Sequence, residues 1–281
     1  ALEKHYPQLD VVIKGMSTKG DEIIDRPLTK IGGKGLFVKE LEHALLQGEA
    51  DIAVHSMKDV PMHLPEGLVL PVVCERGEVR DVLVSSKYSC FDELPAGARI
   101  GTSSARRKAL INYYYSAMAP VDVRGNVHTR LKKLDSGEYD ALIMAGAGLE
   151  RLEESSRICE YISVSQWLPS PGQGALGIEC RAGDSVTQSI IEVLDDPLTN
   201  YQVTAERAVS RALNGGCSVP LAAHADLDEN TLKLKAWLAV PDSSRFIEAS
   251  AYGALSQAQA IGEKVAQDML NNGAQEVLDQ V

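Results

Sequence analysis

The sequence predicts an α/β protein of two similar units followed by a small α+β domain. Apolar, strand-like runs alternate with helical patterns in the first third of the chain, and the same alternation restarts near residue 98. Continuous apolar strands separated by helices are typical of a covered parallel sheet. After about residue 220 a strictly alternating run takes over, which is typical of an antiparallel sheet with one covered face.

The first unit is expected to run strand–helix–strand. Residues 1–8 resemble the last turn of a helix, so we expect further residues before them, and residues 9–16 (LDVVIKGM) predict a strand. Residues 35–48 predict a helix that ends at Gly48. The apolar face of this helix carries Phe37, Leu41, Ala44 and Leu45. Residues 50–57 (ADIAVHSM) predict the next strand.

The second unit repeats the pattern. Its predicted strands are residues 98–104, 119–126 and 139–148, and its predicted helices are residues 105–115 and 127–137. Residues 74–86 lead from the first unit to the second, and residues 175–180 (ALGIEC) return. Two units joined by crossing segments predict a cleft between them. The predicted domains are residues 1–75 with 174–193, residues 79–170, and residues 197–281.

The third domain is predicted from two clear patterns. Residues 232–240 (LKLKAWLAV) place every second apolar side chain on one face of a strand. Residues 258–273 form an amphipathic helix capped at Gly273, with Ala258, Ile261, Val265 and Met269 on its apolar face.

Composition excludes several classes of protein. No apolar run approaches the ~20 residues of a membrane span, and no signal-peptide pattern opens the chain. The five cysteines are widely spaced and form no CxxC pair, which predicts neither a disulfide framework nor a zinc site and favours the cytoplasm. The net charge of −11 disfavours general nucleic-acid binding.

Basic residues nevertheless gather between residues 99 and 133, where eight Lys or Arg accompany one acid, Asp122. Several follow predicted strands, and ligands of open parallel sheets bind beyond the carboxyl ends of strands. A guanidinium group can donate two parallel hydrogen bonds to one carboxylate or phosphate. We therefore expect an anion site. The candidates at strand ends are Ser56, Lys58, Asp59, Thr102, Ser103, Ser104, Arg106, Arg107, Arg124, Arg130 and Arg151.

Asp59 is expected to be the only acid among these groups. It either caps the turn before Pro61 or acts as a carboxylate that faces a substrate becoming cationic. Spacing alone does not separate these roles. For any single arginine of the cluster, an ordinary solvated helix charge is the simpler interpretation, but the whole set at strand ends favours a site.

Three other motifs need an interpretation. Residues 172–177 (GQGALG) match GxGxxG but run from a loop into a strand, so they do not predict a dinucleotide site. Residues 31–37 (IGGKGLF) lack the GK[ST] ending of a phosphate loop and predict a mobile loop that presents Lys34. The histidines show no metal-ligand spacing. Cys217 follows two glycines in LNGGCSVP and is either a small buried side chain or an exposed thiol that carries a group covalently.

Five blocks of the sequence resemble the porphobilinogen deaminase (hydroxymethylbilane synthase) family. They are KGLFVKELEHALLQGEADIAVHSMKDVP, GTSSARR, VRGNVHTRL, PSPGQGALGIEC and GGCSVP, and they occur in the family's order over essentially the whole chain. The resemblance implies two domains similar to periplasmic binding proteins around the cleft and a third domain carrying the cofactor cysteine. It also implies condensation of porphobilinogen, with loss of ammonia, onto a thioether-linked dipyrromethane to give a linear tetrapyrrole.

The resemblance also implies roles for residues. Asp59 would be the catalytic carboxylate, Cys217 the attachment site of the dipyrromethane, and Lys30 and Lys34 part of the mobile loop. The residues that would bind cofactor and substrate are Ser56, Lys58, Thr102, Ser103, Ser104, Arg106, Arg107, Arg124, Arg130, Arg151 and Gln173. The resemblance suggests a monomer, and no metal is expected. The family normally opens with a strand and an Arg-x-Ser motif that this sequence does not contain.

Two other functions remain as alternatives. A solute-binding protein with the same two-unit architecture would use the arginines equally well, but it gives no role to Asp59 or to the Gly-Gly-Cys segment. RNA binding through residues 104–108 (SARRK) is disfavoured by the net charge and by the lack of interleaved aromatic residues. A covalent pyrrole on Cys217 would distinguish the enzyme from both.

Overall fold

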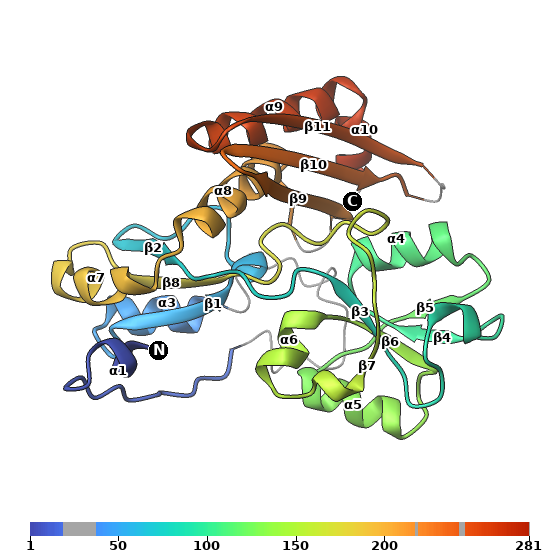
Figure 1. Cartoon of the computed structure of the whole chain (residues 1–281), viewed down its shortest axis with the longest axis horizontal. Helices are drawn as coiled ribbons and strands as arrows, with labels where there is room; N and C mark the ends of the chain where they lie inside the picture. The colour runs from blue at the N-terminus through green and yellow to red at the C-terminus, as the bar shows by residue number, and fades with distance from the viewer. Residues whose placement is uncertain (19–37, 217–218, 242–244, 281) are drawn as a thin grey trace.

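The computed structural model describes residues 1–18, 38–216, 219–241 and 245–280. In this part of the chain there are three sheets, of three, five and three strands (Figure 1). The two α/β units lie side by side, and the C-terminal sheet with its helices covers them on one side (Figure 1). The predicted class, two α/β domains and an α+β domain with an antiparallel sheet, is confirmed.

The first sheet has the order β1-β8-β2. Its strands are β1 (Ile52–Ser56), β2 (Leu68–Val73) and β8 (Leu176–Arg181). Both outer strands pair antiparallel with β8, so the all-parallel sheet predicted for this unit is wrong for the described strands. The reason is topological, because β8 returns from the second unit, enters between β1 and β2, and runs opposite to both. This pairing supports the grouping of residues 174–193 with 1–75, whereas the domain boundaries stay a prediction.

Short helices surround this sheet. They are α1 (Leu2–His5), α3 (Lys39–Leu46) and α7 (Ser185–Ile191). Helix α3 buries Ala44 and Leu45 as predicted, and Gly48 beyond its end has a φ of 69°. Phe37, predicted on the same face, lies outside the described residues.

The strand predicted over residues 9–16 is wrong. Val12 and Ile13 are 83% and 91% exposed, and no described strand pairs with this segment. An apolar extended segment becomes a strand only when a neighbour takes up its backbone N–H and C=O groups. Sequence pattern alone carries no information about that neighbour.

The second sheet has the order β5-β4-β6-β3-β7. Its strands are β3 (Asp81–Val84), β4 (Arg99–Gly101), β5 (Ala119–Val121), β6 (Ala141–Ala145) and β7 (Ile158–Tyr161). Strand β4 is parallel to β5 and β6, but β3 is antiparallel to β6 and β7, so the sheet is mixed rather than parallel. Its helices are α4 (Ala105–Tyr114), α5 (Val127–Asp135) and α6 (Gly146–Arg151). Helix α6 starts inside the predicted strand 139–148, which therefore ends earlier than expected.

The C-terminal sheet is antiparallel throughout, in the order β11-β10-β9. Its strands are β9 (Leu221–Asp228), β10 (Thr231–Ala239) and β11 (Phe246–Ala254), and its helices are α8 (Pro197–Ala212), α9 (Ala258–Asn271) and α10 (Ala274–Leu278). Alternate residues of β10, including Leu232 and Leu234, are buried in one core with Val265 and Met269 of α9, as predicted. Gly273 follows α9 with a φ of 96°, as expected for the predicted cap.

Two crossing segments connect the α/β units. The outward crossing comprises residues 74–80 and the return crossing residues 169–175. The two run side by side, and the Gly77 amide of the first donates to the Gly174 carbonyl of the second at 3.0 Å. Helix α8 lies between the first sheet and the C-terminal sheet (Figure 1). None of the described helices is long and apolar enough to span a membrane.

Candidate active site

The first group of candidate residues follows β1. The strand ends at Ser56 and turns directly into a single 3-10 turn, η2 (Met57–Asp59), so Ser56, Lys58 and Asp59 leave the sheet together, as predicted. Met57 is buried, Ser56 and Lys58 are half-buried, and Asp59 is exposed. Burial lowers the pKa of Lys58, while Asp59 beside it works in the opposite direction. Arg107 also lies in the electrostatic surroundings of Lys58.

The second group forms the turn from β4 into α4. Here hydroxyl groups organise the backbone. The Ser104 side chain caps α4 by accepting from the Arg107 amide at 3.4 Å, and the Ser104 amide donates to Thr102 Oγ1 at 3.3 Å. Ser103 Oγ donates to the Val123 carbonyl at 2.7 Å and so links this turn to the next strand end.

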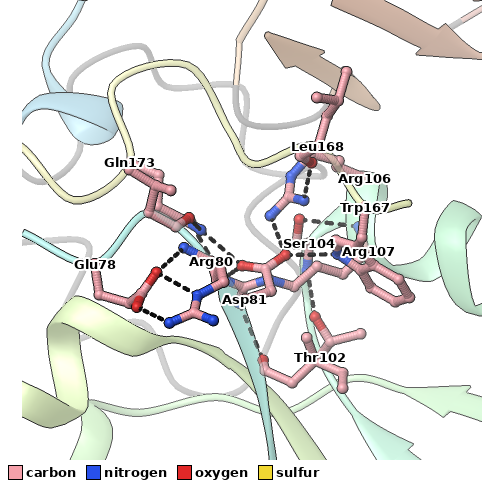
Figure 2. Close-up of polar contacts among 12 residues, drawn as sticks. Glu78, Arg80, Asp81, Thr102, Ser104, Arg106, Arg107, Trp167, Leu168 and Gln173 are labelled. Carbon is pink, nitrogen blue, oxygen red and sulfur yellow. Dashed lines mark hydrogen bonds and ion pairs between the residues drawn. The ribbon is translucent and has the colours of Figure 1, made fainter. Parts of the chain in front are cut away.

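Arg106 and Arg107 lie on the first turn of α4 and both bind Asp81, a fully buried residue at the start of β3 (Figure 2). Arg106 Nη2 is 2.6 Å from Asp81 Oδ2, and Arg107 Nη2 is 2.7 Å from Oδ1. Trp167 Nε1 and Gln173 Nε2 each donate to the same carboxylate at 2.8 Å. The prediction that Asp59 is the only acid among the cationic groups is therefore wrong.

Asp81 fixes how these arginines are held. Burial raises the pKa of the Asp81 carboxyl, but the two guanidinium groups outweigh it and hold the pKa well below its usual range. Arg106 also donates to the Leu168 carbonyl at 2.7 Å, and Arg107 to the Ile143 carbonyl at 3.0 Å. The Nε atoms of both arginines are buried and have no hydrogen-bond partner in the part of the chain that is described.

The side chain of Gln173 makes hydrogen bonds within the protein. Its amide nitrogen donates to Asp81 and, at 2.7 Å, to the Val79 carbonyl, so it fastens the return crossing to the outward one. The side chain is 1% exposed. These contacts give Gln173 a structural role, while its predicted role in binding stays a prediction.

Arg124 and Arg130 stand around the start of α5, which Asn126 caps by accepting from the Thr129 amide at 2.9 Å. Arg130 Nε donates to the Gly125 carbonyl at 2.7 Å. Burial, and to a smaller extent Arg107 and Arg124, lowers the pKa of Arg130 to about 10, while Asp59 acts in the opposite direction. Residues of both α/β units thus share one electrostatic environment around Asp59.

Arg151 lies at the end of α6, one helix beyond the strand end where it was predicted. Its Nη2 donates to the Gly174 carbonyl of the return crossing at 2.6 Å.

Lys30, Lys34 and Cys217 lie outside the described residues. Near the last of these, α8 ends at Ala212, and Gly216 is exposed. Within the described ranges no group of three or more His, Cys, Asp or Glu is placed to hold a metal ion.

A second buried carboxylate, Glu206 of α8, was not predicted from the sequence. It accepts hydrogen bonds from both terminal nitrogens of Arg76 at 2.8 and 2.9 Å. It also accepts them from the Gly172 amide at 2.6 Å and the Ala225 amide at 2.9 Å. It therefore binds both crossings to the C-terminal sheet. An acid on the apolar face of an amphipathic helix, three residues after Val203, is the signal that could have indicated it.

The described geometry thus combines one exposed carboxylate, surrounding cations from both units, and crossings held by buried carboxylates. Residues 1–189 match the family model described as "Porphobilinogen deaminase, dipyromethane cofactor binding domain". Residues 200–271 match the model described as "Porphobilinogen deaminase, C-terminal domain". The chain belongs to the porphobilinogen deaminase family. Its cofactor is accordingly dipyrromethane, and its substrate class is porphobilinogen.

Solved structures of ligand-binding proteins are also similar to this porphobilinogen deaminase family member. A putative methionine-binding lipoprotein from Bacillus subtilis is 15% identical, with a TM-score of 0.38, over 56% of this chain and 74% of its own. An arginine-specific periplasmic binding protein from Salmonella typhimurium is 17% identical, with a TM-score of 0.35, over 57% of this chain and 71% of its own. Similarity this low does not extend to the ligands of those proteins.

Proposed function

We propose that the protein is a hydroxymethylbilane synthase, which joins porphobilinogen units head to tail onto a dipyrromethane attached to Cys217 through a thioether. The observation that carries the proposal is the position of Asp59 within electrostatic reach of both Lys58 and Arg130. A lone exposed carboxylate among cations suits a reaction in which anionic arms must be held while positive charge develops on a ring.

The cations fit such a polycarboxylate cofactor and substrate. Burial lowers the pKa values of Lys58 and Arg130, so the described residues around them compensate their positive charges only in part. A bound carboxylate would stabilise those charges. Lys58, Arg124 and Arg130 would hold the acetate and propionate arms. The buried Nε atoms of Arg106 and Arg107, which have no hydrogen-bond partner among the described residues, would be further donors. When bound, the dipyrromethane supplies a terminal pyrrole carbon as the acceptor.

Asp59 would act on the incoming porphobilinogen. The bond from the methylene carbon to the protonated amino nitrogen would break, its electron pair would leave with the ammonia, and the pyrrole would become a cation. The Asp59 carboxylate would stabilise that cation while the new carbon–carbon bond forms. The same carboxylate would then accept the proton that is released as the ring regains its aromaticity.

We further propose that the protein works as a monomer in a reducing, cytoplasmic compartment. The four described cysteines, Cys74, Cys90, Cys159 and Cys180, are all free, which agrees with such a compartment. Size-exclusion chromatography with light scattering tests the monomer.

The experiment that tests the proposed function is the intact mass of the denatured protein after incubation with porphobilinogen, followed by peptide mapping. We expect an excess equal to two pyrrole units that survives denaturation and maps to the peptide containing Cys217, together with release of ammonia. Protein that keeps its unmodified mass, consumes no porphobilinogen and yet binds carboxylated solutes would contradict the proposal and favour the solute-binding alternative.

A further inference from the structure

Arg207 of α8 contacts the turn that carries Asp59. Its Nη1 donates to the Met57 carbonyl at 3.2 Å and to the Val60 carbonyl at 2.9 Å, and its Nη2 donates to the Pro61 carbonyl at 2.7 Å. These three carbonyls bracket Lys58 and Asp59 in the sequence. A residue of the C-terminal domain thus holds the backbone on both sides of the proposed catalytic carboxylate.

The same turn is held from a second direction by the return crossing. The Met57 amide donates to the Ala175 carbonyl at 3.0 Å. Gly172 has a φ of 74°, and a Cβ at this position would lie 3.0 Å from Met57 Cβ and 3.3 Å from the Lys58 amide nitrogen. Gly172 itself donates to Glu206, the residue before Arg207. Two consecutive side chains of α8 therefore act on one turn, Arg207 directly and Glu206 through Gly172.

The charge of Arg207 is not needed for an ion pair. In the described part of the chain no carboxylate lies within ion-pair distance of its guanidinium, and burial lowers its pKa to about 10. Burying a cation without a counter-ion is unfavourable for stability. Its rigid fork of donors, by contrast, is well suited to fixing several carbonyls at once.

We propose that Arg207 is a positioning residue that fixes the Met57–Asp59 turn and thereby aims the Asp59 carboxylate, an inference that rests on the proposed function for the catalytic role of Asp59. Catalytic groups have to be held to within a fraction of an ångström of their working position, and a displacement of about 1 Å can lower the rate ~10²-fold. Arg207 itself need not touch the substrate.

The test compares three variants of the full chain. Arg207→Met removes all the N–H donors of the side chain. Arg207→Lys keeps the positive charge but loses the planar arrangement of donors in the guanidinium group. Arg211→Met is the matched control, because Arg211 lies one turn further along α8, is exposed, and makes no contact with the turn in the described structure. For each variant kcat is measured per folded, adduct-bearing molecule, together with KM and the hydrogen exchange of the peptide spanning residues 55–62.

For Arg207→Met we expect kcat to fall by ~10²-fold, KM to stay within about threefold, and exchange of the Lys58 to Val60 amides to accelerate about tenfold or more. Arg207→Lys should fall between Arg207→Met and the wild type, at least about threefold below the latter in kcat. Arg211→Met should match the wild type. A general loss of stability would instead reduce the amount of folded protein without changing kcat per folded molecule.

The proposal is overturned if folded Arg207→Met keeps a wild-type kcat and wild-type exchange of this peptide. If Arg207→Met does not fold, Arg207→Lys decides in the same way, and wild-type values for it overturn the proposal. Failure of the proposed function looks different, because the wild type itself would then carry no adduct and consume no porphobilinogen. In that case the exchange data still establish whether Arg207 holds the turn.

Discussion

Asp81 and Arg106 form a buried ion pair, with 2.6 Å between Asp81 Oδ2 and Arg106 Nη2 and side chains that are 0% and 4% exposed. Asp81 begins β3, at the end of the outward crossing, and Arg106 lies on the first turn of α4. Because Gln173 of the return crossing binds the same carboxylate, this pair connects the proposed binding surface to both crossings.

Replacing Asp81 by asparagine should destabilise the protein strongly. The change leaves Arg106 and Arg107 buried without a counter-ion, and breaking such a pair typically costs about 3–5 kcal/mol. Urea unfolding measures this loss. The control is Asp122→Asn, because the Asp122 carboxylate is half exposed and pairs with Lys108 at the surface; we expect a change within about 1 kcal/mol for it. Equal stability of both variants would show that Asp81 is not the anchor described above.

Asp59→Asn should nearly abolish turnover while leaving the fold intact. The amide keeps the size of the side chain but can neither stabilise a cation nor accept a proton, and general acid–base help alone is worth ~10²–10⁴-fold. Steady-state release of ammonia measures the effect, with circular dichroism and urea unfolding as checks on the fold. Glu66→Gln, which removes an exposed carboxylate seven positions later in the sequence, is the control. An Asp59→Asn variant that retains more than about a tenth of wild-type activity contradicts the role.

Arg130→Met should weaken substrate binding. A hydrogen bond to a charged group contributes about 1.5–3 kcal/mol, so we expect KM to rise about 10- to 150-fold. Lys132→Met serves as the control, because Lys132 is exposed on the same helix, two residues away. If both variants kept a wild-type KM, Arg130 would not be a ligand of the carboxylate arms.

His224 should make stability depend on pH. Burial lowers the pKa of its imidazole, but contacts with Asp226 at 2.9 Å and Glu206 at 3.5 Å outweigh burial and raise the pKa to about 9. A histidine whose pKa is higher in the folded state stabilises that state. The stabilisation is complete when the pH is below the unfolded pKa of about 6.5, and it is lost as the pH rises through the folded pKa of about 9. The pKa of Glu206 is lowered to about 2, so its charge stays constant over this range.

The corresponding measurement is the free energy of unfolding of the wild type and of His224→Gln between pH 6 and pH 10. The difference should be up to about 3 kcal/mol near pH 6 and should shrink across pH 6.5–9. His128→Gln, at an exposed position on α5, is the control variant. A difference for His224→Gln that does not change with pH would mean that folding does not raise the pKa of the imidazole.

Cys217→Ser should yield protein without the dipyrromethane, because a serine hydroxyl does not form the thioether. Intact mass spectrometry after incubation with porphobilinogen should detect the adduct on the wild type and on Cys90→Ser, and not on Cys217→Ser. An adduct that persists on Cys217→Ser would place the attachment elsewhere.

Much of the architecture could be predicted from the sequence. Helical patterns located α4, α5 and α9, and alternation in residues 232–240 indicated the covered face of β10. Strand direction in the first sheet could not be predicted, because the strand that pairs with β1 and β2 is β8, about a hundred residues further along the chain. Local patterns carry no information about such distant pairing.

Within the candidate site, the residues after β1 and β4 were found because their polar side chains follow short apolar strands. Asp81 was missed because a single acid before the apolar run Val82–Val84 resembles an ordinary turn residue, and only the fold brings Arg106, Arg107 and Trp167 around it. For the same reason, no pattern in the sequence connects Arg207 with residues 57–61, about 150 positions earlier.

Helix α8 holds several parts of the molecule at fixed positions along its length. Its Glu206 and Arg207 hold the two crossings and the Asp59 turn, and the helix ends at Ala212, shortly before the glycines that precede Cys217. From Arg207 to Ala212 an α-helix advances about 7.5 Å, and one added residue would turn everything beyond it by about 100°. Insertions and deletions within this interval should therefore be tolerated far less than substitutions on its exposed face, because each would change the distance and the rotation between Arg207 and the C-terminal end of the helix.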